Sequence, residues 1–220
     1  ALCNLFLADE INRTSAKTQA ALLEVMEEGG VTVDGITHRT PDPFICIATQ
    51  NPLSSAGTQK LPDSQLDRFM VRLSMGYPDL ESQVDIIRQR QGRNPVDTVR
   101  PLAGASHIRT MKQVAEHVKI KDEVIMYAAK LCEATRSAET VEQGASPRAV
   151  LALVQMAKAS ALMDGRDYVI PQDISSVFID VCAHRLVLTA RARIRKETEA
   201  DVLKKILSDV KPPAVAEGKA

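Results

Sequence analysis

The stretch Leu5-Phe6-Leu7-Ala8-Asp9-Glu10 decides the fold class, because it joins a short apolar run to two consecutive carboxylates. A continuous apolar run of this length is typical of a strand that is buried on both faces of a parallel sheet. Open α/β sheets bind their ligands at the carboxyl ends of such strands. There Asp9 can hold the hydration shell of a Mg²⁺ ion, and Glu10 can orient and polarise an attacking water. The same motif also fits a solvated strand end that has no chemistry.

The residues that follow predict a helix, a hairpin and further strands. Thr14-Ser15 is a capping pair, and the helical pattern after it ends at Gly29-Gly30. Its predicted apolar face consists of Ala16, Ala20, Leu22, Leu23 and Met26. Asp34-Gly35, between two runs of alternating polarity, predicts a tight hairpin turn. We expect a second buried strand over 44–48, a short helix over 66–69 and a third strand over 70–75.

After residue 76 the pattern becomes helical. We expect helices over 79–91, 107–117, 121–137, 147–164, 171–184 and 198–209, with Pro147 and Pro171 in first turns. The predicted fold class is therefore α/β followed by all-α. The α/β domain spans residues 1–76 and the helical domain residues 77–210, and residues 211–220 form a disordered tail.

Three more residues are candidates for the chemistry. Asn51 ends the second strand, where its amide can hold a phosphate and a water, although Asn-Pro also opens ordinary turns. Arg68 precedes Phe69 and is either a surface ion-pair partner or a finger that reaches a neighbouring subunit's phosphates. Arg148 lies in the first turn of a helix, where it opposes the helix dipole unless an anion lies nearby.

In this order and spacing, these features resemble the MoxR branch of the AAA+ ATPases. The similarity runs from residue 5 to about residue 209, and the Asn12-Arg13 pair and the hairpin are its most specific parts. The runs that carry it are 7–13 (LADEINR), 17–24 (KTQAALLE), 31–35 (VTVDG), 48–52 (ATQNP), 66–69 (LDRF) and 144–149 (GASPRA). The resemblance implies part of a P-loop NTPase core, a parallel sheet with a hairpin insert, and a helical lid.

The resemblance also implies a role for each matched residue. Asp9 is similar to the Walker B carboxylate that holds Mg²⁺ through water, and Glu10 to the catalytic base. Asn51 is similar to sensor 1, and Arg148 to the sensor 2 arginine that contacts ATP from the lid. Arg68 resembles the arginine finger that acts in trans. The implied ligands are ATP and Mg²⁺. The implied partners are a hexameric ring of copies and a von Willebrand A-domain protein, and the implied role is chaperone-like remodelling or cofactor insertion.

The chain departs from the family pattern in two places. The loop over 57–64 reads GTQKLPDS where the family has Gly-Thr-Tyr and later Pro-Glu-Ala, which affects an interface loop. No Gly-x-x-x-x-Gly-Lys-Thr run occurs in the 220 residues, so nothing in them cradles the β- and γ-phosphates. We therefore expect the chain to be a piece of a longer ATPase that alone neither binds ATP tightly nor hydrolyses it.

Composition weighs against other classes of function. Lys+Arg and Asp+Glu are 28 each, so no net charge attracts nucleic acid or a membrane surface. The four cysteines form no CxxC pair and the four histidines have no i,i+4 partner, which argues against a metal site. We expect buried reduced thiols, no membrane insertion and a cytoplasmic protein. The arginine-rich stretch 185–196 fits a solvated face or a strip that binds nucleic acid.

Two alternative functions stay open at this point. The chain fits a non-catalytic interaction module, in which the strands and helices bind a partner protein. It also fits a magnesium-chelatase-like AAA+ subunit, although the LADEINR run favours the MoxR branch.

Overall fold

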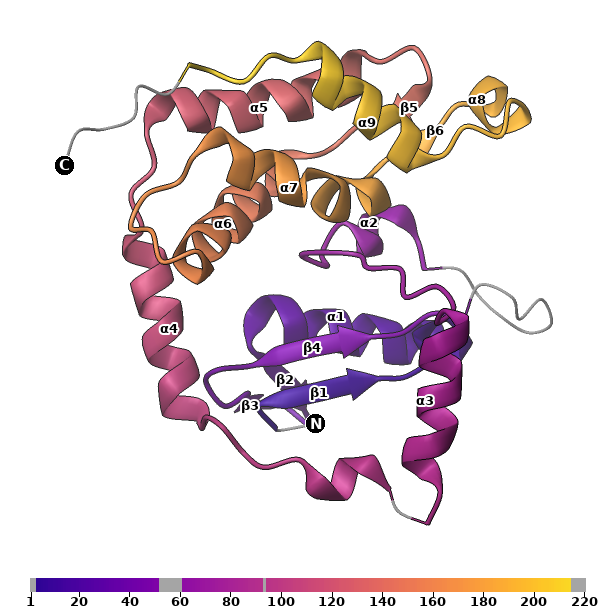
Figure 1. Ribbon diagram of the computed structural model, residues 1–220, viewed down its shortest axis with the longest axis vertical. Helices are drawn as coiled ribbons and strands as arrows, with labels where there is room; N and C mark the ends of the chain where they lie inside the picture. The colour runs from indigo at the N-terminus through magenta and orange to yellow at the C-terminus, as the bar shows by residue number, and fades with distance from the viewer. Residues whose placement is uncertain (1–2, 52–60, 93, 215–220) are drawn as a thin grey trace.

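The computed structural model describes residues 3–51, 61–92 and 94–214. It has a small α/β part followed by a helical part, as the sequence predicts (Figure 1). Strand β1 (Leu5–Ala8) pairs in parallel with β4 (Ile45–Ala48), and their arrows lie side by side. A parallel pair requires a crossover connection, which here contains a short 3-10 helix (Ile11–Arg13), α1 and the hairpin.

The prediction that β1 is buried on both faces is wrong. Leu5 and Leu7 are 59% and 61% exposed, and the alternate residues Phe6 and Ala8 are half-buried. Strand β4 shows the same alternation. Because β1 and β4 form a two-stranded sheet among the described residues, the face that carries Leu5 and Leu7 has no layer packed over it.

Helix α1 (Ala16–Glu28) begins and ends where the sequence predicts. The Ser15 hydroxyl accepts a hydrogen bond from the Thr18 amide at 3.2 Å, and Gly29 ends the helix in the left-handed region at φ 61°. The predicted apolar face is only partly right, because Ala16 and Ala20 are exposed. The buried residues of α1 are Gln19, Leu23 and Val25.

The hairpin is confirmed. Strands β2 (Gly30–Val33) and β3 (Ile36–Arg39) pair antiparallel, with Val33 opposite Ile36. Asp34 and Gly35 both have positive φ, 51° and 79°, which a two-residue turn of this twist requires. The residue pair at the turn is therefore sufficient to explain the register.

Two predicted elements near the end of the α/β part are wrong. The short helix α2 is Asp63–Leu66 rather than 66–69, because Pro62 supplies the N-cap and residues 67–70 form a turn. Residues 70–75 form no strand. Their backbone instead reaches the helical part, where the Arg72 amide donates to Asp180 O at 2.9 Å.

Two exposed helices link the parts. Helices α3 (Leu80–Arg90) and α4 (Ala105–His117) stand on opposite sides of the β1–β4 sheet, joined by a segment with a short 3-10 helix (Pro95–Thr98) (Figure 1). Leu80, Val84 and Ile87 recur at helical spacing on α3 and are all exposed. Helix α3 therefore presents exposed apolar surface.

The helical part has a well-packed core. Leu131, Leu153 and Phe178 are fully buried in it, on three different helices. The predicted helices are confirmed within a few residues. They are α5 (Asp122–Ser137), α6 (Pro147–Met163), α7 (Pro171–Cys182) and α9 (Glu199–Asp209). The sequence missed helix α8 (Ala190–Ile194) and the pair β5 (Val141–Gln143) and β6 (Val187–Leu188), which are too short for a hydrophobic period.

The remaining predictions about the chain have mixed outcomes. Cys132 and Cys182 are buried free thiols, as expected, but Cys46 is half-buried and Cys3 is exposed. In the predicted tail, residues 211–214 form neither helix nor strand, and residues 215–220 lie outside the described residues. Across the part of the chain that the structure describes, none of the helices has the length and apolar character to cross a membrane.

Candidate functional site

The carboxyl ends of β1 and β4 bring the predicted residues to one edge of the sheet. Ala8 lies opposite Ala48, so Asp9 and Glu10 leave the sheet beside the segment that runs from Thr49 to Asn51. The pairing continues one step past the strands. The Thr49 amide donates to Ala8 O at 3.0 Å, and the Ile11 amide donates to Thr49 O at 3.0 Å. The loop after β1 and the loop after β4 are therefore held in a fixed position relative to each other.

Thr49 orients Asp9. Its hydroxyl donates to Asp9 Oδ1 at 2.6 Å and accepts a hydrogen bond from the Glu10 amide at 2.8 Å. The other carboxylate oxygen of Asp9 bonds to no described residue, and the side chain is exposed. Mg²⁺ prefers oxygen ligands and keeps several of its waters, so an exposed, oriented carboxylate fits it as a partner. Sequence reasoning missed Thr49, although its place directly after a strand was a usable signal.

Glu10 has a different geometry from Asp9. Its backbone is left-handed, with φ 47° and ψ 49°, a conformation that non-glycine residues rarely adopt. Backbone strain of this kind is concentrated at functional sites. The Glu10 carboxylate pairs with Arg13 Nη1 at 2.9 Å, and both side chains are partly exposed. An exposed ion pair contributes little to stability, so the carboxylate exchanges this partner easily.

Asn12 fixes the loop that ends at Asn51. Its side-chain Nδ2 donates to Asn51 O at 3.4 Å. Asn12 is buried, and its side-chain Oδ1 has no hydrogen-bond partner among the described residues. A buried acceptor without a donor costs free energy of folding, so packing alone does not explain an asparagine at position 12. The role of the Asn51 side chain stays a prediction.

The sequence predicts Arg68 on a short helix, but Arg68 lies in the turn after α2. Its Nη1 pairs with Glu27 Oε2 at the end of α1, and its side chain is 31% exposed. The neighbouring Phe69 is half-buried. The ion pair agrees with one of the two interpretations that the sequence left open. It leaves the finger role untested.

Arg148 is in the first turn of α6, as predicted, and an anion does lie near it. That anion comes from the chain itself, since Arg148 Nη2 pairs with Glu27 Oε1 at 3.1 Å and its Nη1 lies 4.0 Å from Asp67 Oδ2. Glu27 thus contacts both predicted arginines. Within the described residues, the carboxylates of Asp9 and Glu10 make no ion pair with either arginine.

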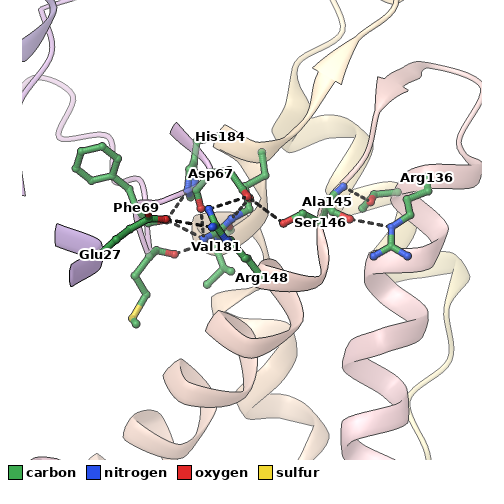
Figure 2. Close-up of polar contacts among 12 residues, drawn as sticks. Glu27, Asp67, Phe69, Arg136, Ala145, Ser146, Arg148, Val181 and His184 are labelled. Carbon is green, nitrogen blue, oxygen red and sulfur yellow. Dashed lines mark hydrogen bonds and ion pairs between the residues drawn. The ribbon is translucent and has the colours of Figure 1, made fainter. Parts of the chain in front are cut away.

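Sequence reasoning missed a polar cluster between the α/β part and the helical part. Figure 2 shows Asp67 and Phe69 next to His184 and Arg148. Arg185 Nε donates to Asp67 Oδ1 at 3.0 Å, although the Arg185 side chain is only 3% exposed. Both interpretations of the 185–196 stretch placed Arg185 at the surface, and they are wrong for this residue. The sequence gives no sign that its partner is 118 positions away.

His184 is buried in this cluster. Its Nε2 lies 2.9 Å from Phe69 O, and its Nδ1 has no hydrogen-bond partner among the described residues. Burial lowers the pKa of His184 to about 4, and the neighbouring charge of Arg185 acts in the same direction. His184 is therefore a neutral ring at pH 7.

Comparison with known proteins identifies the family. A model described as the ATPase family associated with various cellular activities matches residues 1–71, and an AAA lid domain model matches residues 133–206. The chaperone MoxR1 of Mycobacterium tuberculosis is 40% identical over 97% of the chain. The chain belongs to the MoxR branch of the AAA+ ATPases. An uncharacterized Bacillus subtilis protein, YeaC, is 41% identical over 96% of the chain.

A solved structure confirms the fold of this MoxR-type chain. The crystal structure of a predicted ATPase from Cytophaga hutchinsonii superposes with a TM-score of 0.90, at 34% identity over 96% of the chain and 66% of that protein. The chain spans 66% of the length of YeaC and 59% of the length of MoxR1. Magnesium-chelatase subunits also match, but at 24% to 28% identity.

Proposed function

We propose that the full-length protein hydrolyses ATP with Mg²⁺ and that this chain contributes the residues that activate the attacking water. The register of β1 and β4 carries the proposal. Asp9 and Glu10 lie beside the Thr49–Asn51 segment at the carboxyl edge of a parallel sheet, which is the edge where such sheets generally bind ligands. The family membership and the left-handed backbone at Glu10 support it further.

In this proposal Asp9 and Glu10 have separate roles. The exposed oxygen of Asp9 accepts a hydrogen bond from a water of the hydrated Mg²⁺, while Thr49 fixes the other oxygen. Glu10 exchanges Arg13 for the attacking water and accepts a proton at its carboxylate. The Asn51 amide orients that water. When bound, Mg²⁺ supplies positive charge that offsets the charge of the phosphates.

Two arginines complete the proposed site. Arg148 leaves Glu27 to contact the phosphates of its own subunit's ATP, and Arg68 contacts the phosphates in the neighbouring subunit. A guanidinium spreads its charge over several phosphate oxygens, which suits both roles. Each arginine is more than 30% exposed, so neither has to break a buried ion pair to move.

The decisive experiment is ATP turnover by the full-length protein with Glu10→Gln. Loss of a general base lowers turnover by about 100- to 10,000-fold, while ATP binding is retained because the substitution is isosteric. Glu28→Gln is the matched control, since Glu28 is an exposed carboxylate whose side chain makes no ion pair with another described residue. Unchanged turnover in Glu10→Gln rules out Glu10 as the base.

The same assay includes the 220-residue chain by itself. We expect neither tight ATP binding nor turnover, because the sequence has no Gly-x-x-x-x-Gly-Lys-Thr run to cradle the phosphates. Turnover by the purified chain that disappears in Glu10→Gln contradicts this part of the proposal.

The proposal extends to assembly and biological role. We propose a hexameric ring, since an arginine acting in trans requires a neighbouring copy. We also propose a von Willebrand A-domain partner, a chaperone-like remodelling role and a cytoplasmic location, which follow from the family and from similarity to a protein named chaperone MoxR1. The domain boundaries, 1–76 and 77–210, belong to the same proposal.

One observation favours a second candidate function, a non-catalytic interaction module. The exposed sheet face of Leu5, Leu7, Ile45 and Ile47 is apolar, and exposed apolar patches of this kind mark protein contacts. Mixing the chain with a separately prepared upstream half distinguishes the two. Restored ATP turnover supports the ATPase, and partner binding without turnover supports the module.

A further inference from the structure

The turn that carries Arg68 is attached to the helical lid. Arg185 Nε donates to Asp67 Oδ1 at 3.0 Å, and its Nη2 donates to Asp67 O at 3.1 Å and to Phe69 O at 2.8 Å. Its Nη1 donates to Met70 O at 3.3 Å and to Val181 O on α7. One buried guanidinium thus holds the backbone on both sides of Arg68.

Other lid groups bind the same turn. The Ser146 hydroxyl donates to the Asp67 carboxylate at 3.0 and 3.1 Å, and His184 Nε2 lies 2.9 Å from Phe69 O. The Arg72 amide, just past the turn, donates to Asp180 O. From the α/β part, the Glu27 carboxylate reaches the Arg68 side chain through a partly exposed ion pair. The contacts with the lid are buried or partly buried and fix the turn there, while the contact with the sheet side is a more exposed ion pair.

We infer that Arg185 is a positioning residue that sets where Arg68 is presented to the neighbouring subunit. The inference rests on the proposed trans role of Arg68. It also links two sites, because Ser146 immediately precedes the first turn that carries Arg148 and binds the same Asp67 carboxylate. A movement of the lid in response to its own ATP moves the Arg68 turn with it. The neighbour's site then responds to the first subunit's nucleotide state.

The chemistry of the contact requires an arginine. The five N–H donors of a guanidinium lie in a planar fork, and here they meet one carboxylate oxygen and four backbone carbonyls. A lysine ammonium keeps the charge but has three donors on one atom, so it does not span this set. Arg185→Lys therefore loosens the turn without removing the positive charge.

The test uses the assembled full-length protein. With Arg185→Ala or Arg185→Lys we expect kcat to fall by about 100-fold, the usual cost of a small misplacement of a catalytic group. The KM for ATP stays near the wild-type value, because each subunit's own Asp9, Glu10 and Arg148 are intact. Arg191→Ala is the matched control, since Arg191 is an exposed lid arginine whose side chain bonds to no described residue, and it retains the wild-type rate.

Mixing subunits then separates action in trans from action in cis. A Glu10→Gln subunit has a dead site but presents a normal Arg68, and an Arg185→Ala subunit has the opposite defects. In rings assembled from equal amounts of the two variants, half of the sites have an intact Glu10, and half of those lie next to a subunit with an intact Arg185. About one quarter of the sites are therefore complete, so turnover recovers to about one quarter of the wild-type rate. No recovery overturns the inference, because it places the defect in the subunit's own site.

A parallel mixture of Arg68→Ala with Glu10→Gln distinguishes this inference from the proposed function. Recovery with Arg68→Ala but not with Arg185→Ala overturns the positioning role alone. If neither mixture recovers, Arg68 does not act in trans and the inference fails with that part of the proposal. Circular dichroism checks the folding of each variant. Should Arg185→Ala fail to assemble, Arg185→Lys is mixed in its place, with the same outcomes deciding.

Discussion

The helical lid and the α/β part differ in how much apolar surface each one buries by itself. Leu153 in the lid is fully buried, and Leu7 in strand β1 of the α/β part is 61% exposed. Both regions are rich in aliphatic residues, so composition does not account for the difference. The lid helices pack on one another, whereas no element among the described residues covers one face of the two-stranded sheet. The lid therefore has its own hydrophobic core, and the α/β part presents surface suited to contact with further polypeptide.

The largest expected effect compares the same substitution in both regions. In the 220-residue chain, Leu153→Ala lowers the free energy of unfolding by about 2–5 kcal/mol, because it removes buried methyl groups and leaves a cavity. Leu7→Ala changes it by less than about 0.5 kcal/mol, since its side chain is largely in water. Urea unfolding followed by circular dichroism measures both. A large loss in Leu7→Ala contradicts the open face and indicates that this strand is covered in solution, for example by self-association.

The contrast also explains what the sequence could predict. The lid helices follow from hydrophobic periodicity and from cap residues such as Ser146-Pro147, because packing and local preference agree there. The hairpin follows from Asp34-Gly35, because the turn itself fixes the register. A strand over 70–75 was wrong, since the Arg72 backbone pairs with Asp180 on the lid rather than with a strand.

The candidate site divides in the same way. The placement of Asp9, Glu10 and Asn51 at one edge of the sheet could be predicted, because they follow strands whose parallel pairing brings their ends together. Their roles stay a prediction. The contacts of Arg68 and Arg148 with Glu27 could not, because no local pattern places the end of α1 beside the start of α6. Arg185 is the clearest miss. A buried arginine and a solvated one look alike in sequence, and only the partner at Asp67 separates them.

The second prediction concerns pH and the contact between the two regions. The pKa of His184 is about 4 in the fold, below its usual value near 6.5, because burial disfavours the charged ring. Between these two values the unfolded chain binds more protons than the folded chain, so stability falls as the pH is lowered from about 6.5 to about 4. The loss amounts to at most about 3 kcal/mol, and none of it arises above pH 7.

Urea unfolding at a series of pH values measures this dependence. In His184→Gln the part of the slope that comes from His184 disappears, although the variant starts from a lower stability. His38→Gln is the matched control, because His38 is exposed on the hairpin and its removal should leave the slope unchanged. An unaltered slope in His184→Gln contradicts the buried neutral ring. It would mean that the protonation of His184 does not affect the stability of the fold.

The smallest expected effect tests whether the two regions unfold separately. The Thr198 hydroxyl caps α9 by accepting from the Asp201 amide at 3.2 Å, and the Ser15 hydroxyl caps α1 in the same way through Thr18. Removing either hydroxyl by substitution with alanine costs about 1 kcal/mol. Helix α9 packs into the lid core, so we expect Thr198→Ala to speed hydrogen exchange throughout the lid and Ser15→Ala to speed it in α1 alone.

If each substitution speeds exchange in both regions, the chain unfolds as one cooperative unit. The contrast between a self-sufficient lid and an open α/β part would then describe packing but not stability.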